Sequence, residues 1–210
     1  MTTPPAPATT AVCPCVICAA EETKRSGSIR SLLRRPGGAP RVSRRWKRAA
    51  GDVLTHGHHV VGVGGGGSVP DWAFTVGRWH TDRLPELAMF GLDAYGQMNW
   101  LNEAVARLRE GASAEPDSLL TGVIDGYPLL VRPVDAGWLR PLLGTAVGFY
   151  RRAAVPVLQL LWPDRNHRWP WDPEASPGCR AQPRLWLPVA AHPEGVWTEE
   201  AASAEADAAP

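Results

Sequence analysis

The chain has 210 residues and a formal net charge of +1, with 44% hydrophobic and 20% charged residues. These are the values of a globular protein that can bury a substantial core. No apolar run approaches the roughly 20 residues that cross a bilayer, and the start MTTPPAPATT lacks the basic-then-apolar order of a signal peptide. We therefore expect a cytoplasmic protein without a membrane segment.

The charges are unevenly distributed along the chain. Ten Lys or Arg and no acids lie between Lys24 and Arg48, whereas five acids and no Lys or Arg follow Arg184. Composition predicts a disordered, cysteine-containing and basic leader over residues 1–41, a domain over residues 42–190 and a disordered acidic tail over residues 191–210. The basic residues 24–48 suit contacts with nucleic-acid phosphates. Without interleaved aromatic residues, a solvated segment is the favoured interpretation.

The domain begins with a short basic helix that ends at Gly57. Its apolar positions recur at helical spacing and are Val42, Trp46, Ala49, Ala50, Val53 and Leu54. Two strands follow over residues 58–63 and 72–77, joined by a glycine run. Phosphate binding by such a run needs a helix N-terminus directly after it, but here a second strand follows, which favours a plain hairpin loop.

The middle of the chain has the clearest local signals. Residues 84–92 predict a third strand, and Asp93 is a good N-cap for a helix that Gly111 ends. Asp125-Gly126 then marks a hairpin between two apolar stretches, residues 119–124 and 127–132.

A helical segment opens at Asp135 and continues to Tyr150, and Pro141 must break it or start its second half. Residues 155–162 are nearly all apolar and predict a central strand. The order of elements, with its hairpin connections, predicts a single α+β domain. We expect a mainly antiparallel or mixed β-sheet with two to three helices packed on one face.

An ordered set of short motifs makes the chain resemble the bacterial domain-of-unknown-function family 4262. The motifs are Cys15-Val-Ile-Cys18, Phe74-Thr-Val-Gly77, Leu84-Pro-Glu-Leu87 with Gly91, Arg132-Pro-Val-Asp135, Leu158-Gln-Leu-Leu-Trp-Pro-Asp164, Trp169-Pro-Trp171 and Gln182-Pro183. The family has no agreed function, so the resemblance implies membership and not an activity. Its members typically have glycine where this chain has His167, which implies a turn between two strands at that position.

Three cysteines at the start of the chain, Cys13, Cys15 and Cys18, can supply the thiolates of a tetrahedral zinc site. The candidates for a fourth ligand are Cys179, His56, His58 and His59. A full structural site normally shows two paired knuckles, and only one is visible here. A leader whose cysteines have no special role is therefore the favoured interpretation, and a zinc site and free or redox-active thiols stay open as alternatives.

The stretch from Trp162 to Pro173 reads WPDRNHRWPWDP and is the most distinctive in the chain. Trp162, Asp164, Trp169 and Trp171 are expected to form one wall of a pocket for a cationic or sugar-like ligand. In the alternative interpretation, Asp164 and Asp172 cap turns next to prolines while the rings cover the open end of the sheet.

Four more residues are candidates for the same ligand site. The resemblance implies that Thr75, Gly77 and Glu86 matter together, and they can line the pocket from neighbouring strand ends. His80 follows the end of a strand, where binding sites often form.

No nucleophile motif or metalloprotease motif is present, which disfavours an ordinary hydrolase. We expect a binding module for a small ligand or for a protein or peptide partner. The alternatives are an enzyme that uses a cofactor, flavin or zinc, and an accessory protein that tailors a peptide.

Overall fold

The computed structural model describes residues 13–21, 44–151 and 155–207. Its centre is a six-stranded mixed sheet in the order β1-β2-β3-β6-β5-β4. All neighbouring strands are antiparallel except β3 and β6, which run parallel. The predicted α+β class and mixed sheet are therefore confirmed.

The strands form where the apolar alternation and turn signals placed them. Their bounds are β1 His59–Val63, β2 Trp72–Val76, β3 Glu86–Phe90, β4 Leu119–Ile124, β5 Tyr127–Pro133 and β6 Val157–Leu161. The glycine run connects the antiparallel pair β1 and β2, as expected of a hairpin loop. The predicted central strand β6 lies between β3 and β5, and all five of its residues are buried.

The described residues contain more helices than the two to three that we expected. The longer ones are α2 Arg44–His56, α4 Ala94–Arg109 and α8 Val196–Asp207, and the shorter ones are α3 Arg78–Thr81, η2 Ala136–Trp138, α5 Leu139–Leu142, α6 Gly144–Tyr150, α7 Pro177–Arg180 and η3 Val189–Ala191. Asp93 caps α4 as predicted, because its side chain accepts a hydrogen bond from the Gly96 N–H. The helical segment that opens after Asp135 is interrupted at Leu143, between α5 and α6. Pro141 lies within α5 and does not interrupt it.

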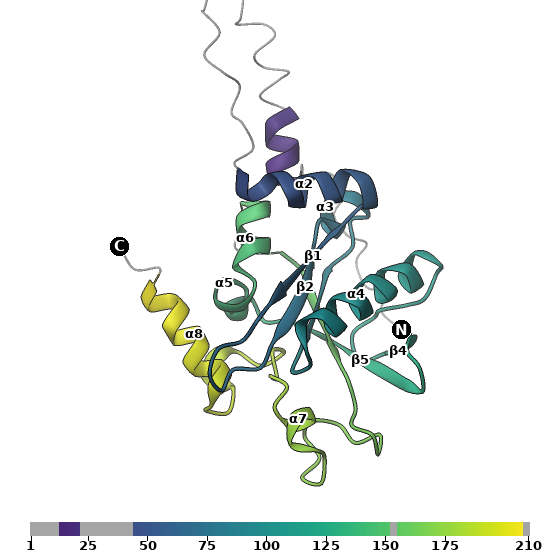
Figure 1. Ribbon diagram of the computed structural model, residues 1–210, viewed down its shortest axis with the longest axis vertical. Helices are drawn as coiled ribbons and strands as arrows, with labels where there is room; N and C mark the ends of the chain where they lie inside the picture. Colours follow the sequence, from purple (N-terminus) through teal and green to yellow (C-terminus); the bar gives the residue numbers. More distant parts are fainter. Residues whose placement is uncertain (1–12, 22–43, 152–154, 208–210) are drawn as a thin grey trace, which may run out of the picture.

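Helices cover both faces of the sheet, so the expectation of a single helical face was wrong. Figure 1 shows α4 on one side of the strands and α5, α6 and α8 on the other. Alternation along the strands explains this, because successive side chains point to opposite faces. In β2, Phe74 packs in the cluster that contains α5, α6 and α8, whereas Ala73 packs in the cluster that contains α4.

Both ends of the described chain contribute to the core. Residues 13–21, expected within a disordered leader, contain a helical turn over residues 16–21, and Cys13, Cys15 and Ile17 are buried in the same cluster as α6. Residues 191–210, expected as a disordered tail, contain α8, whose Trp197 packs edge-on against Phe90. Large apolar side chains override the weak local signal of such segments. The other residues of the predicted leader and tail, 1–12, 22–43 and 208–210, lie outside the described residues.

Among the described helices, none has both the length and the apolar character needed to cross a membrane.

Candidate metal centre and ligand pocket

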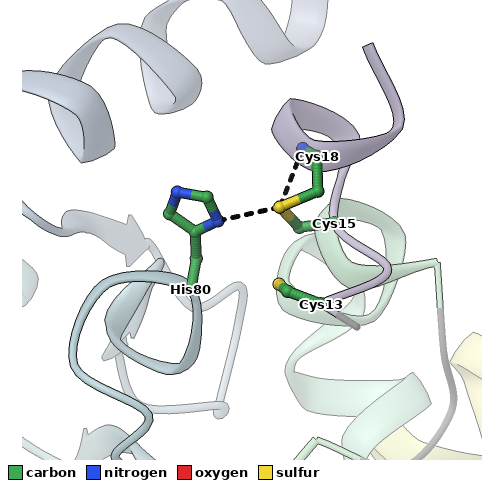
Figure 2. A group of neighbouring side chains, drawn as sticks. All are labelled: Cys13, Cys15, Cys18 and His80. Atoms are coloured by element: carbon green, nitrogen blue, oxygen red, sulfur yellow. Dashed lines mark hydrogen bonds between the residues drawn. The ribbon is translucent and has the colours of Figure 1, made fainter. Parts of the chain in front are cut away.

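Two segments that are far apart in the sequence bring four metal-ligating side chains together. Cys13, Cys15 and Cys18 come from residues 13–21, and His80 comes from the short helix α3 after β2. Their ligand atoms all lie within 4.8 Å of one another. Figure 2 shows the imidazole of His80 facing the three cysteines.

The distances within this cluster approach those of a tetrahedral zinc site. The Nδ1 atom of His80 is 3.2 Å from the Sγ of Cys15 and 3.4 Å from the Sγ of Cys18. Zinc bonds of about 2.3 Å to sulfur and about 2.0–2.1 Å to nitrogen place tetrahedral S and N ligands about 3.6 Å apart. The backbone N–H of Cys18 also points at the Sγ of Cys15, at 3.4 Å, where it favours a thiolate. The cluster can therefore hold a metal such as zinc.

Without a bound cation, burial disfavours the ionised forms of Cys15 and Cys18. Burial raises the pKa of the Cys15 thiol to about 12 and also raises the pKa of Cys18. Burial lowers the pKa of His80, which keeps the imidazole in the neutral form that binds metals. A bound cation reverses the effect on the thiols, because it stabilises their ionised form.

The fourth ligand is the point at which the sequence expectation needs correction. Cys179 is buried on the α4 side of the sheet, where its thiol faces the carbonyls of Trp162 and Arg168. His59 pairs with Asp52, His58 contacts Asn102, and His56 is exposed at the end of α2. The fourth member of the cluster is instead His80, which we had expected at the ligand pocket.

A buried carboxylate holds the turn that carries His80. Glu86 is 0% exposed, and one of its oxygens accepts hydrogen bonds from the backbone N–H groups of Gly77, at 2.9 Å, and Trp79, at 3.2 Å. Its other oxygen accepts from the Thr75 hydroxyl at 2.6 Å, and the hydroxyl of Tyr150 donates to the carboxylate as well. Thr75, Gly77 and Glu86 are therefore joined in one hydrogen-bond network that fixes the start of α3.

Tyr150 is the member of this network that sequence reasoning missed. Its hydroxyl also accepts from the Gly77 N–H at 2.9 Å. Burial, followed by the negative charge of Glu86, raises the pKa of Tyr150 and keeps the hydroxyl protonated as a donor. No local signal announces this role, because 64 positions separate Tyr150 from Glu86.

The glycine at position 77 is required by the turn itself. Its φ of +111° lies in a region that side chains rarely adopt, and a Cβ there would lie 2.3 Å from the Cγ2 of Val53. Gly77 therefore allows α3 to start directly after β2 and to sit close against α2.

A cavity at the other end of the sheet is lined by some of the residues that we expected at a ligand site. A cavity of about 520 Å³ is lined by Leu92, Trp100, Ile124, Tyr127, Trp162, Pro163, Asp164, Arg165, Asn166 and Ser176. Trp162 and Asp164 line it as expected. Thr75, Gly77, His80 and Glu86 do not, because Glu86 pairs with Val157 at the start of β6, whereas Trp162 follows the end of that strand.

Trp169 and Trp171 also lie outside this cavity. Their rings stack on each other with centroids 5.9 Å apart, and Trp171 meets Trp186 edge-on. Trp171 is 41% exposed, so the stack is a surface feature. The expectation that both rings belong to the pocket wall with Trp162 was wrong.

The carboxylate of Asp164 accepts hydrogen bonds from backbone N–H groups of the loop that follows it. One oxygen accepts from the N–H groups of Asn166 and Arg168, at 2.8 and 3.0 Å, and the other accepts from the N–H of Ser176 at 2.9 Å. These bonds, with that of Arg168 first, lower the pKa of the Asp164 carboxyl. Asp172 likewise accepts from the Glu174 N–H. The alternative interpretation, that the aspartates cap turns, describes both residues.

His167 occupies a turn as the resemblance implied. Its φ is +59°, in the left-handed region that glycine adopts most easily, and its ring stacks on Tyr127 with centroids 5.2 Å apart. The expected second strand is absent, since no strand follows β6 in the described part of the chain. The positive φ at residue 167 is the structural reason why glycine suits that position.

Comparison with known proteins gives one match. The model of the family described as "Domain of unknown function (DUF4262)" matches residues 52–176, a span that includes His80 but not the three cysteines. No curated protein matches the chain, and no solved structure does.

Proposed function

Because the chain belongs to the DUF4262 family, whose description assigns no activity, we propose from the side-chain geometry that it is a zinc protein with a Cys3His centre. The main support for this proposal is that the ligand atoms of Cys13, Cys15, Cys18 and His80 all lie within 4.8 Å of one another. Thiolates and imidazole are the ligands that zinc prefers.

A centre with four protein ligands has a structural role. Catalytic zinc sites keep a position open for water or substrate, whereas four side chains complete the tetrahedron. Here the metal would fasten residues 13–21 to the turn after β2, and a link between points 62 to 67 residues apart in the chain removes much unfolded-state entropy. The geometry therefore favours a binding module with a structural metal over a zinc enzyme.

Metal content of the purified full-length chain tests this proposal. We expect one zinc per chain by elemental analysis after exhaustive desalting, and an intense visible absorption after substitution with Co²⁺, as four-coordinate thiolate sites give. Cys15→Ser and His80→Ala should each reduce the retained metal. Cys179→Ser and His56→Ala remove the same residue types outside the cluster and should leave it unchanged. A wild-type chain that retains no zinc after incubation with an excess would overturn the proposal.

A second candidate function, the binding of a small ligand, is favoured by the cavity beside Trp162. Its volume of about 520 Å³ lies within the usual range of small-molecule sites, roughly 300–1,000 Å³. Trp100 from α4, Tyr127 from β5 and Trp162 after β6 contribute aromatic walls. We propose that this cavity takes a flat, mainly apolar ligand, which those rings can contact on its faces.

Indole is a suitable probe of the cavity, because it is flat and has one polar N–H. In saturation-transfer NMR, we expect wild-type protein to transfer magnetisation to indole and Trp100→Ala to lose most of that transfer. Trp171→Ala removes an equally large ring outside the cavity and serves as the control. If Trp171→Ala loses the signal and Trp100→Ala keeps it, the surface stack is the binding site and the cavity is not.

A further inference from the structure

Arg78 is a buried arginine whose hydrogen-bonding capacity is mostly unused. It is 2% exposed, and its Nη1 donates to the carbonyl of Pro85 at 2.6 Å. Its Nε is buried without a partner. Among the described residues, no carboxylate forms an ion pair with it, and Nη2 has no hydrogen bond. An unsatisfied buried charge of this kind is costly unless something else compensates it.

The nearby acids compensate this charge only in part. The acids that act on Arg78 through space are Glu86 and Asp82. The oxygens of Glu86 are occupied by Thr75, Gly77, Trp79 and Tyr150, as described above. Asp82 pairs with Arg109. An arginine side chain stays protonated in proteins, so the guanidinium is a cation with free donors.

Arg78 also lines a cavity that the metal centre and the Trp162 pocket do not share. The cavity has a volume of about 480 Å³ and lies where β3 begins, against the end of α4 and the loop that follows it. Leu84, Pro85, Leu108 and Leu158 give it apolar walls, and residues 111–116 close one side. This volume suits a small molecule.

We propose that this cavity binds a small carboxylic acid with an apolar body. Nη1 donates to the Pro85 carbonyl, so the Nε and Nη2 edge of the guanidinium has no hydrogen-bond partner among the described residues. The two parallel N–H groups of that edge match the two oxygens of a carboxylate. The leucine and proline walls accommodate the apolar body. A dianion such as phosphate fits less well, because Glu115 and the carbonyl end of α4 border the cavity.

Benzoate and benzamide form a matched pair of probes, since they share a ring and differ in charge. Titration calorimetry on the zinc-treated full-length protein should show binding of benzoate to one site, with benzamide weaker by about tenfold or more, as expected for the loss of charge-assisted hydrogen bonds. Inorganic phosphate should bind more weakly than benzoate. Equal binding of benzamide, tighter binding of phosphate, or no binding of benzoate would overturn the proposal.

Two variants locate the site. Arg78→Lys keeps the charge but removes the planar fork, and should weaken benzoate binding about tenfold or more. Because a buried arginine is sensitive to replacement, Leu108→Trp provides a second route: it fills the cavity without altering Arg78. Leu54→Trp, at a residue that is 67% exposed on α2, is its control. Benzoate affinity that Leu108→Trp leaves unchanged would place the ligand elsewhere.

Discussion

The Nδ1 atom of His80 lies 3.2 Å from the Sγ of Cys15, although 65 positions separate the two residues. This contact joins a segment that precedes the matched family region to the turn after β2. If the cluster binds zinc, the metal therefore also attaches residues 13–21 to the rest of the fold.

Removal of the metal should therefore destabilise the fold. A ligand present at 100 times its dissociation constant stabilises the folded state by about 2.7 kcal/mol, which corresponds to roughly 5–10 °C in Tm for a domain of this size. We expect a strong chelator to lower the Tm of the wild type by at least this amount in differential scanning calorimetry. His80→Ala should start at the lower Tm and not respond to chelator, whereas His56→Ala should behave like the wild type. A Tm that chelator leaves unchanged in the wild type contradicts a structural metal.

Gly77→Ala should be strongly destabilising. The added methyl meets Val53 at 2.3 Å, and the backbone has a φ of +111°. Left-handed strain costs about 1–2 kcal/mol and overpacking a further 1–3 kcal/mol, so we expect a loss of about 2–5 kcal/mol in urea-induced unfolding. Gly67→Ala is the matched control, because its φ is also positive, at +61°, but nothing lies within 4 Å of its added methyl. Similar losses in both variants would show that the close approach to Val53 is unimportant.

Glu86→Gln should destabilise the chain and weaken metal retention together. The amide group that replaces one carboxylate oxygen faces hydrogen-bond donors, and each buried donor left unpaired costs about 1–3 kcal/mol. Because Glu86 holds the Gly77 and Trp79 N–H groups, the turn that presents His80 is loosened as well. Urea unfolding and zinc content measure the two effects. Glu103→Gln, on the exposed face of α4, should change neither by a measurable amount.

The stability contributed by Asp164 should depend on pH in the acid range. Its pKa is lowered below the ordinary value of 3.8 by the N–H groups of Arg168, Ser176 and Asn166. A carboxyl whose folded-state pKa is depressed contributes stability that is complete above the unfolded-state pKa and is lost as pH falls through the folded-state value. The difference in unfolding free energy between wild type and Asp164→Asn should therefore be full near about pH 7 and shrink below about pH 3.8. Asp125→Asn is the control, and a difference that stays constant across this range contradicts the assignment.

Local sequence patterns predicted the elements of the sheet well. Alternation and glycine-containing turns located its strands, and Asp93 located the start of α4. These signals depend only on residues that are neighbours in the sequence, so they can be recognised without knowledge of the fold. The same signals failed for α8, where a polar, alanine-rich sequence forms a helix because Trp197 packs against Trp72 and Phe90.

The candidate sites were predictable only in part. The spacing of Cys13, Cys15 and Cys18 indicated a metal site, and Trp162 with Asp164 indicated a cavity. The fourth ligand could not be chosen, since four histidines precede the third strand and spacing does not distinguish them. No sequence pattern near Arg78 indicated that this residue is buried beside a cavity.

By itself the sequence determined the family and the α+β class, and it offered the three cysteines as possible ligands, because motifs, element patterns and cysteine spacing are each found within short stretches of the chain. Only the tertiary structure decided that His80 completes the cluster, that Glu86 and Tyr150 hold its turn, and that Trp169 and Trp171 lie outside the pocket. Strand pairing and helix packing fix these contacts, and periodicity reports which face a side chain occupies but not which distant residue it meets.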